Sequence, residues 1–146
     1  MKLLTCLFYF IIFIEKGGFY MWVEYNPNPS GKSVGDCVIR AVAKVLDLSW
    51  EEAYAELCLQ GYMMHDMPSA NEVWGAYLKS KGFKREMIPA SCADCYTIED
   101  FTKEYPKGVY VIGTGKHAVA CIDGKTFDSW DSEKEAPIYF YRKVEA

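Results

Sequence analysis

The spacing of the apolar residues changes along this chain from the period of a helix to that of a strand, and the change falls near Pro106. Upstream, apolar side chains recur every three or four residues, as in the run Val38, Ala41, Val42, Val45 and Leu46. Downstream, they alternate in four segments, at 108–112, 116–122, 125–130 and 137–142. Because helices precede strands, the sequence predicts an α+β fold in which N-terminal helices pack on a C-terminal antiparallel sheet.

Capping and turn signals set the expected boundaries of the helices. Two capping boxes, at 49–52 and 69–72, predict the starts of two helices after the one that begins at Cys37. Glycines are expected to close these two helices, at Gly61 and Gly82. A brief fourth helix is expected from 97, and short strands are expected at 22–25 and 83–88.

The length and charge of the chain restrict its function. The chain has 146 residues, which is enough for one domain with a substantial core and too few for two. Its formal net charge is −4, whereas nucleic-acid-binding domains normally carry a basic face. We therefore expect no nucleic-acid partner.

The first 20 residues are set apart from the expected domain, which spans 21–146. An apolar run at 3–14 is too short to cross a bilayer, and no small-residue cleavage site follows it. A start at Met21 is the preferred interpretation, followed by a membrane-associated leader that retains 3–14 as an anchor, and then by a cleaved signal peptide. Without that anchor, no membrane contact is expected.

The six cysteines are irregularly spaced, which is typical of a reduced, cytoplasmic protein and not of a disulfide framework. Cys58 and Cys121 lie in apolar runs and are expected to be buried free thiols. Cys92 and Cys95 form a lone CxxC pair without a second pair or a nearby histidine, so we expect no metal site. No phosphate-binding glycine loop is present, and no cofactor is expected.

Cys37 is the strongest candidate for a reactive residue. It follows a loop rich in glycine and proline and opens an apolar-periodic helix. The free N–H groups and the dipole at a helix N-terminus favour the thiolate, which is the nucleophilic form of cysteine. A buried small residue at a helix start is the alternative interpretation.

A histidine and an acid complete a possible triad. Asp123 and Gly124 predict a two-residue hairpin turn, which places His117 opposite Trp130. Side chains two residues apart in a strand share a face, so Asp128 is expected to hydrogen-bond His117. The acid would then orient the imidazole and stabilise its charged form. The other histidine of the chain, His65, lies in a methionine-rich loop and is interpreted as a packing or rim residue.

Three motifs resemble those of the papain-like cysteine peptidase superfamily. They are Gly35-Asp36-Cys37 at a helix start, Gly115-Lys116-His117-Ala118-Val119 at a strand start, and Asp128-Ser129-Trp130. The last is similar to the Asn-Ser-Trp of papain, with aspartate in place of asparagine. The chain also resembles small uncharacterised proteins encoded by bacteriophages and prophages. The resemblance implies a papain-like fold with Cys37, His117 and Asp128 as catalytic residues, and it places Trp130 at the substrate.

One position departs from the papain pattern. Papain-like enzymes usually place a glutamine six residues before the nucleophile to stabilise the oxyanion, and that position is Gly31 here. A side-chain amide can replace it, and the expected donor is Asn28, with Asn26 and Ser33 as alternatives.

Together these features predict a papain-like cysteine hydrolase, a peptidase or isopeptidase that acts on a peptide or protein substrate. An acyltransferase would use the same residues, because an amine would replace water. The second alternative is a non-catalytic papain-like module that binds a host protein, in the host cytoplasm if the chain is phage-encoded.

Overall fold

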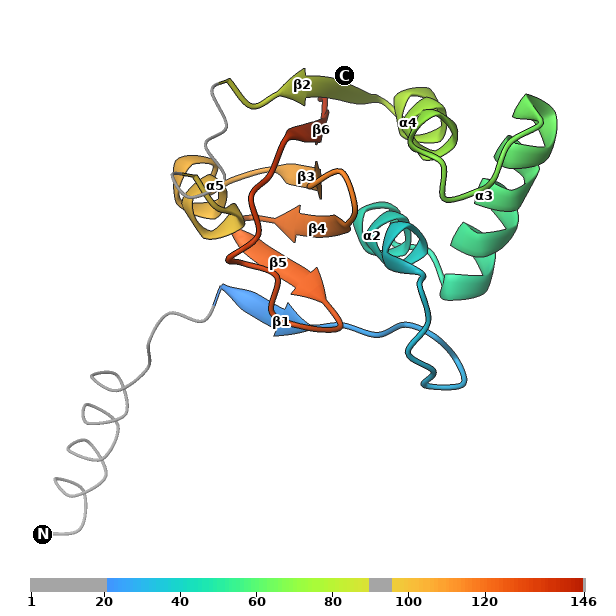
Figure 1. Cartoon of the computed structure of the whole chain (residues 1–146), viewed down its shortest axis with the longest axis horizontal. Coiled ribbons are helices and arrows are strands. Elements are labelled where there is room, and N and C mark those ends of the chain that lie inside the picture. Colours follow the sequence, from blue (N-terminus) through green and yellow to red (C-terminus); the bar gives the residue numbers. More distant parts are fainter. Residues whose placement is uncertain (1–20, 90–95, 146) are drawn as a thin grey trace, which may run out of the picture.

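The computed structural model describes residues 21–89 and 96–145 (Figure 1). In this part of the chain, four helices and six strands form an α+β fold. The helices are α2 (Cys37–Leu46), α3 (Trp50–Met64), α4 (Asn71–Ser80) and α5 (Ile98–Glu104). The strands are β1 (Trp22–Glu24), β2 (Phe83–Met87), β3 (Val109–Gly113), β4 (Ala118–Ile122), β5 (Lys125–Asp128) and β6 (Tyr139–Lys143).

The strands form one mixed sheet in the order β1-β5-β4-β3-β6-β2. The C-terminal strands β3 to β6 pair antiparallel, as expected, but the sheet is mixed because the N-terminal strand β1 pairs in parallel with β5. The backbone explains this pairing: Thr126 N donates to Met21 O at 2.8 Å, and Tyr25 N donates to Asp128 O at 2.8 Å. A strand of three residues has too little alternation to reveal its direction from sequence. This pairing ties the start of the described chain to Asp128.

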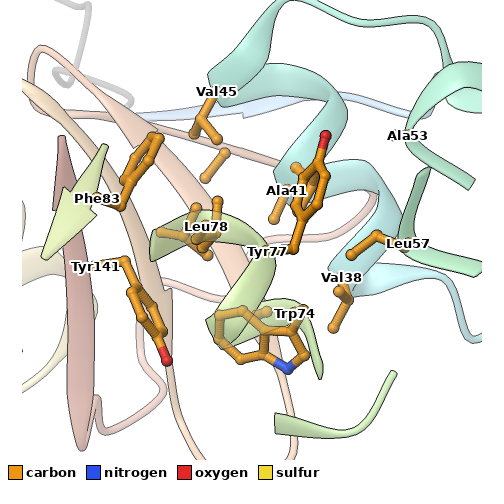
Figure 2. Close-up of a cluster of buried hydrophobic side chains, with 14 of the residues drawn as sticks. Val38, Ala41, Val45, Ala53, Leu57, Trp74, Tyr77, Leu78, Phe83 and Tyr141 are labelled. Atoms are coloured by element: carbon orange, nitrogen blue, oxygen red, sulfur yellow. The ribbon is translucent and has the colours of Figure 1, made fainter. Parts of the chain in front are cut away.

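Helices cover both faces of the sheet (Figure 1). On one face, α2, α3 and α4 pack over a core that includes Val42, Leu57, Trp74 and Leu78 (Figure 2). On the other face, α5 packs through Phe101 against a second, smaller apolar cluster. The sequence predicted the first layer of helices, whereas the crossing of α5 to the opposite face was not anticipated.

The structure confirms two capping boxes and corrects a third. The Ser49–Glu52 box and the box of Thr97 with Asp100 are both formed. The box expected at 69–72 is wrong, because α4 begins after Ala70 and no side chain caps it. The expectation that Gly61 closes α3 is wrong, because the helix continues to Met64 and the chain then folds back against Gly61. A Cβ on Gly61 would lie 2.6 Å from the backbone oxygen of Asp66, so this helical position requires glycine.

The two-residue turn between β4 and β5 is confirmed. Ile122 pairs with Lys125, and Asp123 and Gly124 have φ angles of 49° and 75°. Two positive φ values are typical of the type I′ hairpin turn. This register fixes which side chains of β4 and β5 share a face, and so it positions the site.

Replacing Leu57 with alanine should destabilise the fold strongly. Leu57 is 0% exposed in α3, so the change removes buried apolar area and leaves a cavity. We expect the free energy of unfolding to fall by about 2–5 kcal/mol in a urea titration. Leu59→Ala is the matched control in the same helix, because Leu59 is 58% exposed and its loss should cost within about 0.5 kcal/mol. Equal costs for the two variants would contradict the packing of α3.

Candidate active site

A cleft of about 270 Å³ opens between the first residues of two helices and the turn that joins β3 to β4. Three segments line the cleft. They are α2 with the loop before it (Gly35, Cys37 and Val38), α4 with the loop before it (Ser69, Asn71 and Trp74), and the turn with the start of β4 (Gly115, Lys116, His117 and Ala118). No side chain caps α2 or α4 at its N-terminus. Their first N–H groups are therefore left for other partners, and both helix dipoles favour negative charge at their starts.

Cys37 and His117 are brought together in this cleft, although 80 residues separate them in sequence. The Cys37 thiol lies beside the His117 imidazole and near the backbone N–H of Ala118, so that both groups can donate to its sulfur. His117 directly precedes β4, after a turn in which Gly115 has a φ of 87°. A nucleophile and a base within hydrogen-bonding reach form the basic unit of covalent catalysis.

Asp128 holds the far side of the imidazole. His117 Nε2 hydrogen-bonds the Asp128 carboxylate, as the hairpin register predicted, so Nδ1 is the nitrogen left for Cys37. Asp128 is 1% exposed and accepts two further hydrogen bonds of 2.8 Å, from the Ser132 hydroxyl and the Ser129 backbone N–H. The carboxylate is thereby fixed in position before any substrate binds.

A buried arginine, which the sequence analysis missed, extends this arrangement into α2. Arg40 is 5% exposed; its Nη2 donates to Asp128 at 3.1 Å and its Nη1 donates to Asp36. Asp36 also accepts from Trp50 Nε1 at 2.8 Å, which explains why its carboxylate does not cap the helix. The sequence pattern that could have predicted this ion pair is an aspartate and an arginine four residues apart, with the arginine between the apolar residues Ile39 and Ala41.

These contacts set the protonation states of the three residues. Burial favours the neutral Cys37 thiol, but the His117 and Ala118 hydrogen bonds and the nearby positive charges outweigh it and lower the pKa of Cys37. Burial also opposes the His117 imidazolium, yet Asp128 and Cys37 raise its pKa to about 9. For Asp128, burial is outweighed by His117, Ser132 and Ser129, and its pKa is lowered. Compared with free side chains, the site therefore favours a thiolate on Cys37 and an imidazolium on His117, beside an ionised Asp128.

The two further residues singled out in the sequence lie in different places. The Trp130 ring is 45% exposed and lies 5.0 Å from the His117 ring, centroid to centroid, beside the imidazole. Asn28 does not line the cleft, and its side-chain oxygen accepts from Ser30 N at 2.9 Å within its own loop. The structure therefore gives no support to Asn28 as an oxyanion donor.

An asparagine that the sequence analysis did not consider, Asn71, lines the cleft instead. Its Oδ1 accepts from Trp74 Nε1 at 3.2 Å. An indole N–H can only donate, so the asparagine atom that faces it must be the oxygen. The Nδ2 amide is consequently left to donate to another group. No sequence spacing pointed to Asn71, because α4 lies far along the chain from Cys37.

Of the five other cysteines, the structure describes two, Cys58 and Cys121. Both are free thiols, and Cys121 is buried as expected, whereas the expected burial of Cys58 is wrong because it is only half-buried in α3. Burial raises the pKa of Cys121 to about 12. Cys6, Cys92 and Cys95 lie outside the described residues, as do the apolar run at 3–14 and its proposed roles.

Within 21–89 and 96–145, no three His, Cys, Asp or Glu side chains are grouped so that they could hold a metal ion. In the same part of the chain, no helix has the length and apolar character needed to cross a bilayer.

Comparison with known proteins found no match among protein-family models, curated proteins or solved structures.

Cys37 should be the most reactive cysteine of the chain towards iodoacetamide. At about pH 6.5 an ordinary thiol is almost wholly protonated, whereas the lowered pKa of Cys37 gives it a larger fraction of thiolate. We expect mass mapping after limited alkylation of the full chain to find the label on Cys37, with Cys121 unlabelled. His117→Ala removes the imidazolium and should slow labelling of Cys37 about tenfold or more at this pH. Faster labelling at Cys92 or Cys95, with Cys37 unaffected by His117→Ala, would contradict the assignment.

Proposed function

We propose that this protein is a papain-like cysteine hydrolase that cleaves an amide bond in a peptide or protein. The observation that carries the proposal is the contact series from Cys37 through His117 to Asp128 at an open cleft. Each residue also has the acid–base properties that its role requires: Cys37 is a thiol with a lowered pKa, His117 has a raised pKa, and Asp128 is a buried, ionised acid. A module that only binds a partner has no need of this arrangement.

The proposed reaction follows from these protonation states. The Cys37 thiolate attacks the scissile carbonyl carbon, and the carbonyl electrons form an oxyanion. The His117 imidazolium gives its proton to the leaving amine as the C–N bond breaks, which leaves a thioester on Cys37. Neutral His117 then takes a proton from water, and the resulting hydroxide releases the acid and regenerates the thiolate. An amine in place of water would give acyl transfer with the same residues.

Two donors are available for the oxyanion. One is the backbone N–H of Cys37, at the uncapped start of α2. We assign the second to the Asn71 amide, which lines the same cleft and whose orientation is fixed by Trp74. In this proposal Asn71 takes the role that the sequence analysis gave to Asn28. Trp130 covers the imidazole and limits the access of water to the hydrogen bond between His117 and Asp128.

Acylation by p-nitrophenyl acetate tests both assignments. The full chain should release p-nitrophenolate with an acetyl group mapped to Cys37, and Cys37→Ser should abolish both. Asn71→Asp keeps the acceptor for Trp74 but loses the donor, so acylation should slow by about 10²-fold to 10³-fold. Iodoacetamide alkylation of the same variant should persist, since alkylation forms no oxyanion.

Asn28→Ala is the matched control and should acylate at the wild-type rate. If Cys37 is never acetylated in the wild type, the hydrolase proposal is wrong. If Cys37 is acetylated but Asn71→Asp and Asn28→Ala behave alike, the hydrolase proposal stands and the role of Asn71 falls.

A further inference from the structure

A second cavity, of about 330 Å³, lies beside the catalytic cleft. The side chains that line it come from the end of α3, from α4, from β2 and from β6. Asn71 lines both the cleft and this cavity, so the two hollows adjoin at the start of α4. The wall between them includes Trp74, which lines the cleft, and Tyr139, which lines the cavity, with ring centroids 6.0 Å apart.

Small residues in α4 create the space. Glu72, Gly75, Ala76 and Lys79 follow one face of the helix, and the two in the middle have little or no side chain. A Cβ on Gly75 would lie 2.3 Å from the Tyr141 hydroxyl, so only glycine lets this ring approach the helix. Trp74 and Tyr141 lie side by side here, with centroids 5.2 Å apart (Figure 2).

Arg85 presents a positioned guanidinium to this cavity. It lies on the edge strand β2, paired with Tyr141 of β6, on the face of the sheet that α4 covers. The guanidinium lies 4.4 Å from the centre of the Tyr139 ring. Stacking on an aromatic ring orients a guanidinium and leaves N–H groups at its edge available to donate.

The charge of Arg85 is not neutralised by an acidic neighbour. Among the described residues, no carboxylate lies within 4.0 Å of Arg85, whereas Arg142, on the opposite face, pairs with Glu86 at 2.8 Å. The cavity lining carries two cations, Arg85 and Lys79, and one acidic group, Glu72. This is an excess of one positive charge in a chain whose formal net charge is −4. The cavity is therefore suited to a carboxylate.

We propose that this cavity is a specificity subsite that binds an acidic side chain of the peptide substrate through Arg85. The inference rests on the proposed function, because only a substrate lying in the cleft would extend past Asn71 into the cavity. A guanidinium and a carboxylate bind through two parallel hydrogen bonds, which gives selectivity over the neutral amide of glutamine. Lys79 adds long-range attraction, and Glu72 disfavours a second acidic group.

A library of peptides with many different sequences tests this subsite. The full chain is incubated with a synthetic library of N-acetylated, C-amidated peptides, and cleavage sites are identified by mass spectrometry against a Cys37→Ser background. We expect Asp or Glu at one fixed position within a few residues of the cut, with about a tenfold preference for Glu over Gln. Arg85→Gln should lose this preference, and Arg85→Glu should favour Lys or Arg at the same position.

Lys84→Glu is the matched control. Lys84 is the neighbour of Arg85 on the same edge strand, and alternation places it on the opposite face of the sheet. The variant makes the same change in charge and should keep the wild-type cleavage profile. A shift of that profile equal to the shift caused by Arg85→Glu would show a general charge effect and overturn the subsite.

The remaining outcomes distinguish a failure of the subsite from a failure of the hydrolase proposal. Cleavage without acidic enrichment in the wild type overturns the subsite and leaves the hydrolase proposal intact. No cleavage above the Cys37→Ser background overturns the hydrolase proposal, and the subsite with it. A parallel library with free C-termini distinguishes the other source of a carboxylate: cuts at a fixed distance from the C-terminus, found in this library alone, would replace the acidic side chain with the terminal carboxylate.

Discussion

The buried carboxylate of Asp128 is the group on which the rest of this structure depends. It accepts hydrogen bonds from Arg40 of α2, from His117 before β4 and from Ser132 in the following loop. Its backbone carbonyl also accepts from Tyr25 N and from Trp22 Nε1, which joins β1 to the sheet edge. Burying a charge without partners costs on the order of several kcal/mol. The fold and the site therefore share one electrostatic requirement.

That requirement is met by charges that alternate in sign. Asp36, Arg40, Asp128, His117 and Cys37 form a continuous series in which each member contacts the next. In their favoured protonation states, the charges of these five residues are negative, positive, negative, positive and negative in that order. Arg40 alone cannot neutralise two buried carboxylates, so the arrangement favours a proton on His117. The imidazolium in turn stabilises the thiolate, and the Asp36–Arg40 ion pair at the start of α2 is thereby coupled to the reactivity of Cys37.

The parts of this arrangement that sequence could predict are those set by local geometry. The two-residue turn at Asp123 and Gly124 was readable, and through strand alternation it placed Asp128 on the face of His117. Cys37 was readable from the loop before its helix. Contacts between distant segments were not readable: the parallel pairing of β1, the side of the sheet covered by α5, and the presence of Asn71 at the cleft. These features depend on how the helices and strands pack in three dimensions, and residue spacing along the chain does not predict that packing.

The most direct test of this account is the pKa of His117, followed by NMR of the imidazole nitrogens and of Hε1 across a pH titration of the full chain. The chain has two histidines, His117 and the exposed His65, so only two sets of imidazole resonances need to be assigned. The account predicts that His117 stays protonated through neutral pH and titrates near 9, and that Cys37→Ser lowers this pKa because the thiolate partner is lost. A His117 that titrates at or below the ordinary value of about 6.5, and does not respond to Cys37→Ser, would contradict the thiolate–imidazolium pair.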